Sequence, residues 1–215
     1  MKKICIFLIC LLFSINATAD CPKQKVEIHF KYKLGKVVYN YSQSRYQFSK
    51  FSPEHRKNPS NLLGLTVSKL GVGFPKVEGK VFKHNGKSCV GVSKINFEIG
   101  FDKFNVYIDK KYGYGTCERR VIKEHEDEHV LIYKEGMRFF APDIKKAIRQ
   151  AVKELKPQEV NSEAMAQRIF EEQAKQVVNK VQPLLNHINK KLEEKQGAID
   201  TPESYARSNK KCKNW

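Results

Sequence analysis

A stretch without proline or glycine, residues 116–135, is the feature that most constrains this chain. Within it the sequence reads His125-Glu126-Asp127-Glu128-His129, a complete H-E-x-x-H. Positions i and i+4 of a helix lie one turn apart on the same face, so both imidazoles can reach one metal ion. Zinc accepts neutral imidazole nitrogens, and the glutamate after the first histidine can take a proton from a metal-bound water. The pattern therefore predicts a zinc-binding helix with His125 and His129 as ligands and Glu126 as general base.

The same stretch is also compatible with a charged, solvent-facing helix surface, because Glu124, Glu126, Asp127 and Glu128 form an acidic run. Two features favour the metal site. The chain has six histidines, and two of them stand at the ligand spacing. The motif also lies on a predicted helix, in a chain that carries the marks of an exported protein.

The first residues have the pattern of a secretory signal peptide. Lys2 and Lys3 precede a mostly apolar run, residues 4–15, and Ala17-Thr18-Ala19 fits the small-residue cleavage site. This interpretation assigns residues 1–19 to the signal and makes Asp20 the first mature residue. The run is short for a membrane span, although an uncleaved anchor is the alternative. No later run is apolar enough to cross a membrane, so we expect a periplasmic or secreted protein.

The chain is strongly basic. Loss of Lys2 and Lys3 lowers the formal net charge from +17 to +15. The excess is spread along the chain and could serve solubility alone, or it could attract an anionic envelope surface. No basic-aromatic nucleic-acid motif is present, so no nucleic-acid partner is expected.

Four cysteines remain after signal cleavage, at positions 21, 89, 117 and 212. An even number in an exported chain predicts disulfides, so the candidates are Cys21, Cys89, Cys117 and Cys212. Three pairings are possible, and the sequence does not choose among them. No two of these cysteines have C-x-x-C spacing, which argues against a cysteine-bound metal.

Residues 20–115 read as strands and turns. Expected strands are residues 26–32 and 37–41 around a turn at Gly35, then 62–67, a hairpin of 81–82 and 88–92, 95–99 and 104–108. Asn85-Gly86 is the predicted hairpin turn. Residues 116–215 read as helical. Expected helices are residues 116–140, 143–155 after a break at Pro142, and 161–196 with a kink at Pro183 and a stop at Gly197. The fold class is therefore α+β, an N-terminal antiparallel strand region followed by a helical metal-binding region, together forming one compact domain, 20–215.

Several residues around the motif keep a spacing that resembles a known family. They are Cys117, Val121, His125, Glu126, His129, Val130, Tyr133 and Phe140-Ala141-Pro142. The family comprises small exported bacterial proteins described as predicted secreted zinc-dependent proteases, related to the DUF922 group. Residues 104–108, residues 199–205 and the terminal Cys212 and Trp215 are similar to it as well. The resemblance covers about residues 88–215 and implies a zincin-like metallopeptidase.

The third metal ligand is not fixed by the motif. The longer pattern H-E-x-x-H-x-x-G-x-x-H fails, because Ile132 and Glu135 stand at the glycine and third-histidine positions. In the related sequences the tail carries Tyr-Asp and a downstream histidine. Here Ile199-Asp200 matches the first part and Tyr205 replaces that histidine. Asp200 and Glu203 are therefore the main ligand candidates. Lesser candidates are His187, Glu171 and Glu172. Tyr205 is a candidate hydrogen-bond donor to a reaction oxyanion.

These observations lead to two functional hypotheses. The first is a secreted or periplasmic zinc metalloendopeptidase that hydrolyses a peptide or protein substrate through a zinc-activated water, with the strand region forming one wall of the substrate cleft. The alternative is a non-catalytic envelope-associated binding module, with a structural metal or none. An open coordination position on the metal would distinguish the two.

Overall fold

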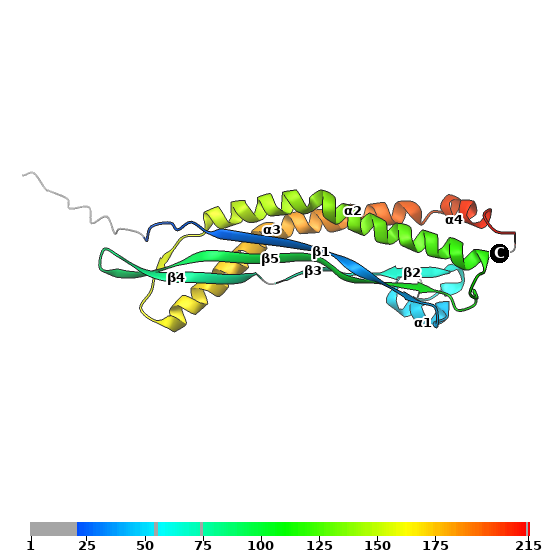
Figure 1. Cartoon of the computed structure of the whole chain (residues 1–215), viewed down its shortest axis with the longest axis horizontal. Coiled ribbons are helices and arrows are strands. Elements are labelled where there is room, and N and C mark those ends of the chain that lie inside the picture. Colours follow the sequence, from blue (N-terminus) through cyan, green and yellow to red (C-terminus); the bar gives the residue numbers. More distant parts are fainter. Residues whose placement is uncertain (1–20, 54–55, 74, 214) are drawn as a thin grey trace, which may run out of the picture.

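The computed structural model describes residues 21–53, 56–73, 75–213 and 215. The expected signal peptide, residues 1–19, and Asp20 lie outside the described residues. The described part is elongated, with two long helices running beside a long, narrow sheet (Figure 1). Apart from the two-residue strand β6, strands fill the first half of the chain and long helices the second. The α+β class is therefore confirmed.

One strand, β5 (Lys87–Ile108), is the centre of the sheet, and every other strand pairs with it. Along one edge lie β1 (Glu27–Asn40), which is parallel to β5, and the short β6 (Gln158–Glu159). Along the other edge lie β4 (Lys76–His84), β3 (Leu70–Val72) and β2 (Gly64–Val67), all antiparallel to β5. The sheet is thus mixed, and the expectation of an antiparallel strand region is wrong for β1.

Two glycines explain why the expected strand breaks do not occur. Gly35 has a φ of +69° but lies within β1 instead of reversing the chain. A Cβ at this position would lie 2.7 Å from the Phe104 ring, so glycine permits close packing of the two strands here. Gly100, with a φ of +131°, lies within β5, where a Cβ would lie 2.1 Å from the carbonyl oxygen of Lys33. The predicted hairpin at Gly35 and the predicted gap between residues 99 and 104 are therefore wrong.

The hairpin predicted at Asn85-Gly86 is confirmed. β4 and β5 pair from Lys76 to the turn, with His84 opposite Lys87. Asn85 has a φ of 49° and Gly86 a φ of 77°. Two successive left-handed residues define the type I′ turn that matches the twist of paired strands. Between β1 and β2, the described residues form short helical turns, α1 (Arg45–Phe48), η1 (Ser49–Phe51) and η2 (Pro59–Asn61).

The helix that carries the H-E-x-x-H motif is longer than predicted. α2 runs without interruption from Cys117 to Glu154, so the predicted break at Pro142 is wrong. Proline removes one backbone hydrogen bond, but its ring is exposed here, and Met137 and Ile144 on either side are buried. Packing of both halves on the same core outweighs the local cost of the proline.

The second long helix, α3 (Glu163–Ile199), begins where the sequence predicts. The Ser162 side chain accepts a hydrogen bond from the Met165 amide and caps it. The helix contains Pro183 and continues past Gly197, the predicted stop. A further short helix, α4 (Pro202–Asn209), was not predicted from the polar tail. Thr201 caps α4, and Pro202 occupies its first turn.

The core lies between the sheet and the apolar faces of α2 and α3. Its largest fully buried side chains include Phe97, Phe101, Phe104, Ile144, Ile148, Ile188 and Leu192. Gly136 allows the two helices to approach, because a Cβ there would lie 2.2 Å from the Leu192 side chain. Among the described helices, none is long and apolar enough to span a membrane.

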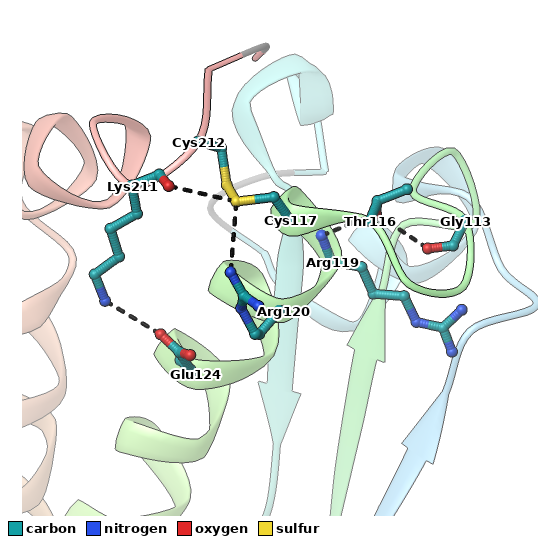
Figure 2. The surroundings of a disulfide bond; sticks show 8 residues. All are labelled: Gly113, Thr116, Cys117, Arg119, Arg120, Glu124, Lys211 and Cys212. Carbon is teal, nitrogen blue, oxygen red and sulfur yellow. Dashed lines mark hydrogen bonds and ion pairs between the residues drawn. A yellow bond between two sulfur atoms is a disulfide. The ribbon is translucent and has the colours of Figure 1, made fainter.

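All four cysteines among the described residues form disulfides, as the sequence predicts. Cys21 pairs with Cys89, and Cys117 pairs with Cys212. The first bond joins the segment before β1 to the start of β5. The second joins the first residue of α2 to the segment after α4 (Figure 2). Two disulfides are compatible with an exported protein.

Candidate metal centre

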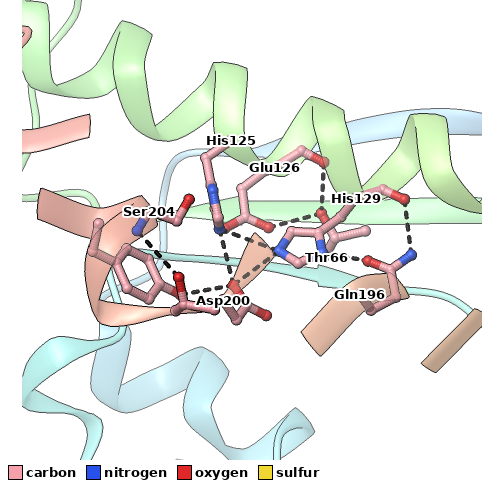
Figure 3. A network of polar contacts seen from close by, with 9 residues as sticks. Thr66, His125, Glu126, His129, Gln196, Asp200 and Ser204 are labelled. Atoms are coloured by element: carbon pink, nitrogen blue, oxygen red, sulfur yellow. Dashed lines mark hydrogen bonds and ion pairs between the residues drawn. The ribbon is translucent and has the colours of Figure 1, made fainter. Parts of the chain in front are cut away.

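Three potential metal ligands converge beside α2. His125 and His129 lie one turn apart on the same helix face, and Asp200 caps the end of α3 opposite them (Figure 3). The two histidine Nε2 atoms are 3.2 Å apart. Asp200 Oδ1 lies 3.0 Å from Nε2 of His125 and 3.2 Å from Nε2 of His129. The three atoms form a nearly equilateral triangle.

The size and chemistry of this triangle fit a metal ion. Ligand atoms about 2.0–2.1 Å from a tetrahedral ion lie about 3.3 Å from one another, which is close to the observed separations. Each of the three side chains can present a lone pair to the same point. His125 and His129 are largely buried, while Asp200 is partly exposed. The group could therefore hold a metal ion and leave one position open toward solvent.

Gln196 fixes which nitrogen of His129 can bind a metal. Its amide nitrogen donates to the His129 backbone carbonyl at 3.0 Å, and its amide oxygen contacts Nδ1 of the His129 ring. Because the backbone carbonyl can only accept, the amide oxygen must face the ring, and Nδ1 must carry the hydrogen. Neutral His129 then has its lone pair on Nε2, which faces Asp200. Sequence reasoning missed Gln196, although it stands one helical turn before Asp200.

The side chain of Glu126 is buried next to the three ligands. Its residue is 3% exposed, and Thr66 in β2 donates from Oγ1 to Glu126 Oε2 at 2.8 Å. Burial raises the pKa of Glu126, although the nearby His129 and the Thr66 hydrogen bond oppose the rise. Gly64 lets β2 come this close, because a Cβ there would lie 2.6 Å from Glu126 Oε1. Thr66 and Gly64 carry no signal in the sequence that connects them with the motif.

Asp200 organises the charges of the centre. Burial would raise its pKa, but hydrogen bonds from His125 and His129 outweigh burial and hold the pKa well below its usual range. Burial also opposes protonation of His129, yet the hydrogen bond to Asp200 and the charge of Glu126 raise the pKa of His129 to about 9. Asp200 and Glu126 thus favour the protonated form of His129 when no metal is bound.

The structure places the other predicted residues as follows. Tyr205 in α4 donates from its hydroxyl to Asp200 Oδ1 at 2.8 Å, and burial together with Asp200 raises its pKa. Tyr205 thus contacts the ligand candidate Asp200. Its predicted role as a hydrogen-bond donor to a reaction oxyanion stays a prediction. Glu203 lies in the first turn of the same helix, is exposed and lies outside the ligand group. The lesser candidates are also exposed and outside the group: His187, Glu171 and Glu172.

The Cys117–Cys212 disulfide holds the tail that carries Asp200 and Tyr205 against α2. α4 has no buried residue, so it gains little from packing in the core. Beyond α4, Lys211 forms an ion pair with Glu124 of α2, with 3.2 Å between Nζ and Oε2 (Figure 2). An exposed ion pair contributes little by itself. The disulfide is therefore the strongest link between the tail and the motif helix.

A cavity of about 300 Å³ opens beside the centre. Strand β2 lines it, together with Gln196, Asp200 and Tyr205. Glu126 and His129 line the same cavity. A ligand in this space would touch the candidate base and the candidate metal at the same time.

Comparison with known proteins gives no match to a family model, to a curated protein or to a solved structure. The resemblance drawn from the sequence therefore remains an expectation. The chemistry of the centre rests on its own side chains.

Proposed function

We propose that this protein is an exported zinc metallopeptidase, as the sequence resemblance implies. The observation that carries the proposal is the convergence of His125, His129 and Asp200 on one point, with the buried carboxylate of Glu126 beside them. Two imidazoles and one carboxylate form a ligand set that suits zinc and leaves a fourth position for water. Zinc bound there would act as a Lewis acid and lower the pKa of a water molecule.

The chain's own groups support the proton transfers that peptide hydrolysis needs. Glu126 Oε2 accepts from Thr66, which leaves Oε1 to receive a proton from the attacking water. The raised pKa of Glu126 suits a group that takes this proton and then gives it to the leaving amine. Gln196 keeps the His129 ring in the tautomer that leaves Nε2 free. Tyr205 holds Asp200 in place through its hydroxyl.

The surroundings of the centre support an extended peptide as substrate. β2 pairs with β5 along one edge, and no other strand among the described residues pairs with its second edge. An extended peptide can add to such an edge through backbone hydrogen bonds. The cavity beside the centre is lined by β2, Glu126, His129 and Asp200, so a peptide on β2 would lie next to the candidate base and the ligand group.

The test compares Glu126→Gln with Glu128→Gln, an exposed neighbour outside the ligand group. Zinc content of the oxidised mature protein should be about one equivalent in both variants, because neither residue is a ligand. Hydrolysis of a mixed peptide library should fall by about 10²- to 10⁴-fold in Glu126→Gln and stay unchanged in Glu128→Gln. Retained hydrolysis in Glu126→Gln would refute the proposed role of the base. Zinc binding without hydrolysis by the unmodified protein would favour the non-catalytic binding module instead.

A further inference from the structure

A second cleft lies at the far end of α2 from the metal centre. It has a volume of about 520 Å³ and is bounded by residues 23–26 before β1, by the last turns of α2 and by Pro157. A cavity of about 640 Å³ adjoins it, since Lys23, Lys156 and Gln173 line both. The rise of an α-helix places Arg149 about 36 Å from His125 along α2. The cleft is therefore separate from the candidate active site.

The floor of this cleft is aliphatic. It consists of Val26, Ile28, Val92, Val152 and Leu155. These side chains belong to the edge of the main core, so the floor is continuous with the packed interior. Val92, Val152 and Leu155 are already buried by the protein itself, so a hydrocarbon chain on the floor would mainly remove the partly exposed Val26 and Ile28 from water, at about 25 cal/mol per Å².

The rim of the cleft is cationic and lacks counter-charges. Five cations line it without an ion-pair partner among the described residues: Lys23, Lys25, Arg149, Lys153 and Lys156. Among the described residues that line the cleft or the adjoining cavity, the one carboxylate is Glu154, and it already pairs with Lys180 at 2.9 Å. Basic residues near a helix C-terminus often donate hydrogen bonds to the free backbone carbonyls of its last turn. Here Lys23 does so by donating to the Lys153 carbonyl at 3.2 Å, which leaves the other cations available to a ligand.

Both walls of the cleft are fixed in place. The Cys21–Cys89 disulfide anchors the segment that carries Lys23 and Lys25. On the other side, the Gln173 amide donates to the Lys156 carbonyl at 2.8 Å, and Gln173 is 2% exposed. A preformed cleft with an apolar floor and a charged rim is the usual design of a small-molecule site.

We propose that this cleft binds a single-chain anionic amphiphile, with its hydrocarbon chain on the aliphatic floor and its acidic head between Arg149 and Lys156. The cations of the rim select the acidic head, and the aliphatic residues of the floor select the hydrocarbon chain. The site is independent of the metal centre and of the proposed peptidase function. It also gives part of the large positive charge of the chain a specific role.

The experiment measures binding of dodecanoate, below its micelle concentration, by calorimetry on the oxidised mature protein. Saturable binding of one equivalent is expected, whereas acetate and dodecyl maltoside, which lack the chain and the charge respectively, should bind at least about tenfold more weakly. Arg149→Glu combined with Lys156→Glu should weaken dodecanoate binding by about tenfold or more. The same result is expected with and without zinc, which separates this site from the metal centre.

The matched control reverses the same number of charges elsewhere. Lys36 and Lys103 are exposed register partners in β1 and β5, so Lys36→Glu with Lys103→Glu replaces one like-charged pair by another. This variant should bind dodecanoate as the unmodified protein does. An equal loss of dodecanoate binding in both variants would show that net charge alone causes the effect, and it would overturn the proposal. So would binding to phosphatidylglycerol vesicles without any saturable binding of dodecanoate, because the cations would then serve a membrane surface.

Discussion

Removing one disulfide should weaken metal binding, while removing the other should not. In the double variant Cys117→Ser and Cys212→Ser, the tail after α3 loses its covalent link to α2. That tail carries Tyr205 in α4, which has no buried residue, and Asp200 lies at its beginning. The tail should open locally in this variant, and the third ligand should be held in place less of the time.

The other disulfide provides a control, because its removal should destabilise the folded protein by nearly the same amount. The Cys117–Cys212 bond closes 95 residues and should stabilise the protein by about 4.7 kcal/mol through restriction of the unfolded chain. The Cys21–Cys89 bond closes 68 residues and should contribute about 4.4 kcal/mol by the same reasoning. Global destabilisation is thus matched, but only the first bond is next to the metal centre. We expect roughly 10- to 100-fold weaker zinc affinity in Cys117→Ser/Cys212→Ser and little change in Cys21→Ser/Cys89→Ser.

Competition with a chromophoric zinc chelator measures the affinity, and denaturant unfolding of each variant measures the stability loss. Equal zinc affinities in the two variants would refute the idea that the tail is clamped for metal binding. The Cys21→Ser/Cys89→Ser variant should instead lose affinity for dodecanoate, because one wall of the basic cleft is released. The two disulfides should therefore separate the two sites experimentally.

Three further predictions concern the metal centre. Asp200→Asn should reduce zinc affinity by at least about 100-fold, whereas Glu203→Gln should leave it unchanged; chelator competition decides between the two carboxylates. Gln196→Leu should reduce zinc affinity by roughly 10- to 100-fold, because the His129 tautomer is no longer fixed, and an unchanged affinity would contradict the hydrogen-bond assignment. In the metal-free protein the pKa of His129 is raised from 6.5 to about 9. The stability it contributes is therefore complete below about pH 6.5 and is lost as the pH rises through 9, a decline of at most about 3 kcal/mol. Denaturant unfolding across this range should show the decline, and His129→Gln should flatten it.

Local patterns of residues predicted the elements that depend on local interactions alone. The Asn85-Gly86 turn follows from the two left-handed residues that a two-residue hairpin requires. The start of α3 follows from the Ser162 cap. The paired histidines could be placed on one helix face because their spacing depends only on helix geometry.

Contacts between distant parts of the chain were not predictable in this way. A strand has the same alternation of side chains whether its partner is parallel or antiparallel, so nothing local revealed that β1 runs parallel to β5. Gly35 gives the same signal in a turn and inside a twisted strand. Thr66 reaches Glu126 across about 60 residues of sequence, and neither residue marks the other. The sequence could not distinguish Asp200 from Glu203 as the third ligand, because the choice depends on how the end of α3 lies against α2.

The register of β1 on β5 also has a consequence for how the chain folds. From Glu27 opposite Lys94 to Asn40 opposite Tyr107, partners are separated by the same interval along the chain, because the two strands are parallel. All these contacts therefore require closure of a loop of the same length, and non-local pairing of this kind is slow. The Cys21–Cys89 bond joins the two segments just before the first of these pairs. Once this disulfide has formed, the two strands can begin to pair from the linked end, and no long loop has to close first. Oxidation early in folding should then accelerate assembly of the sheet, and the reduced chain should fold with a much slower rate.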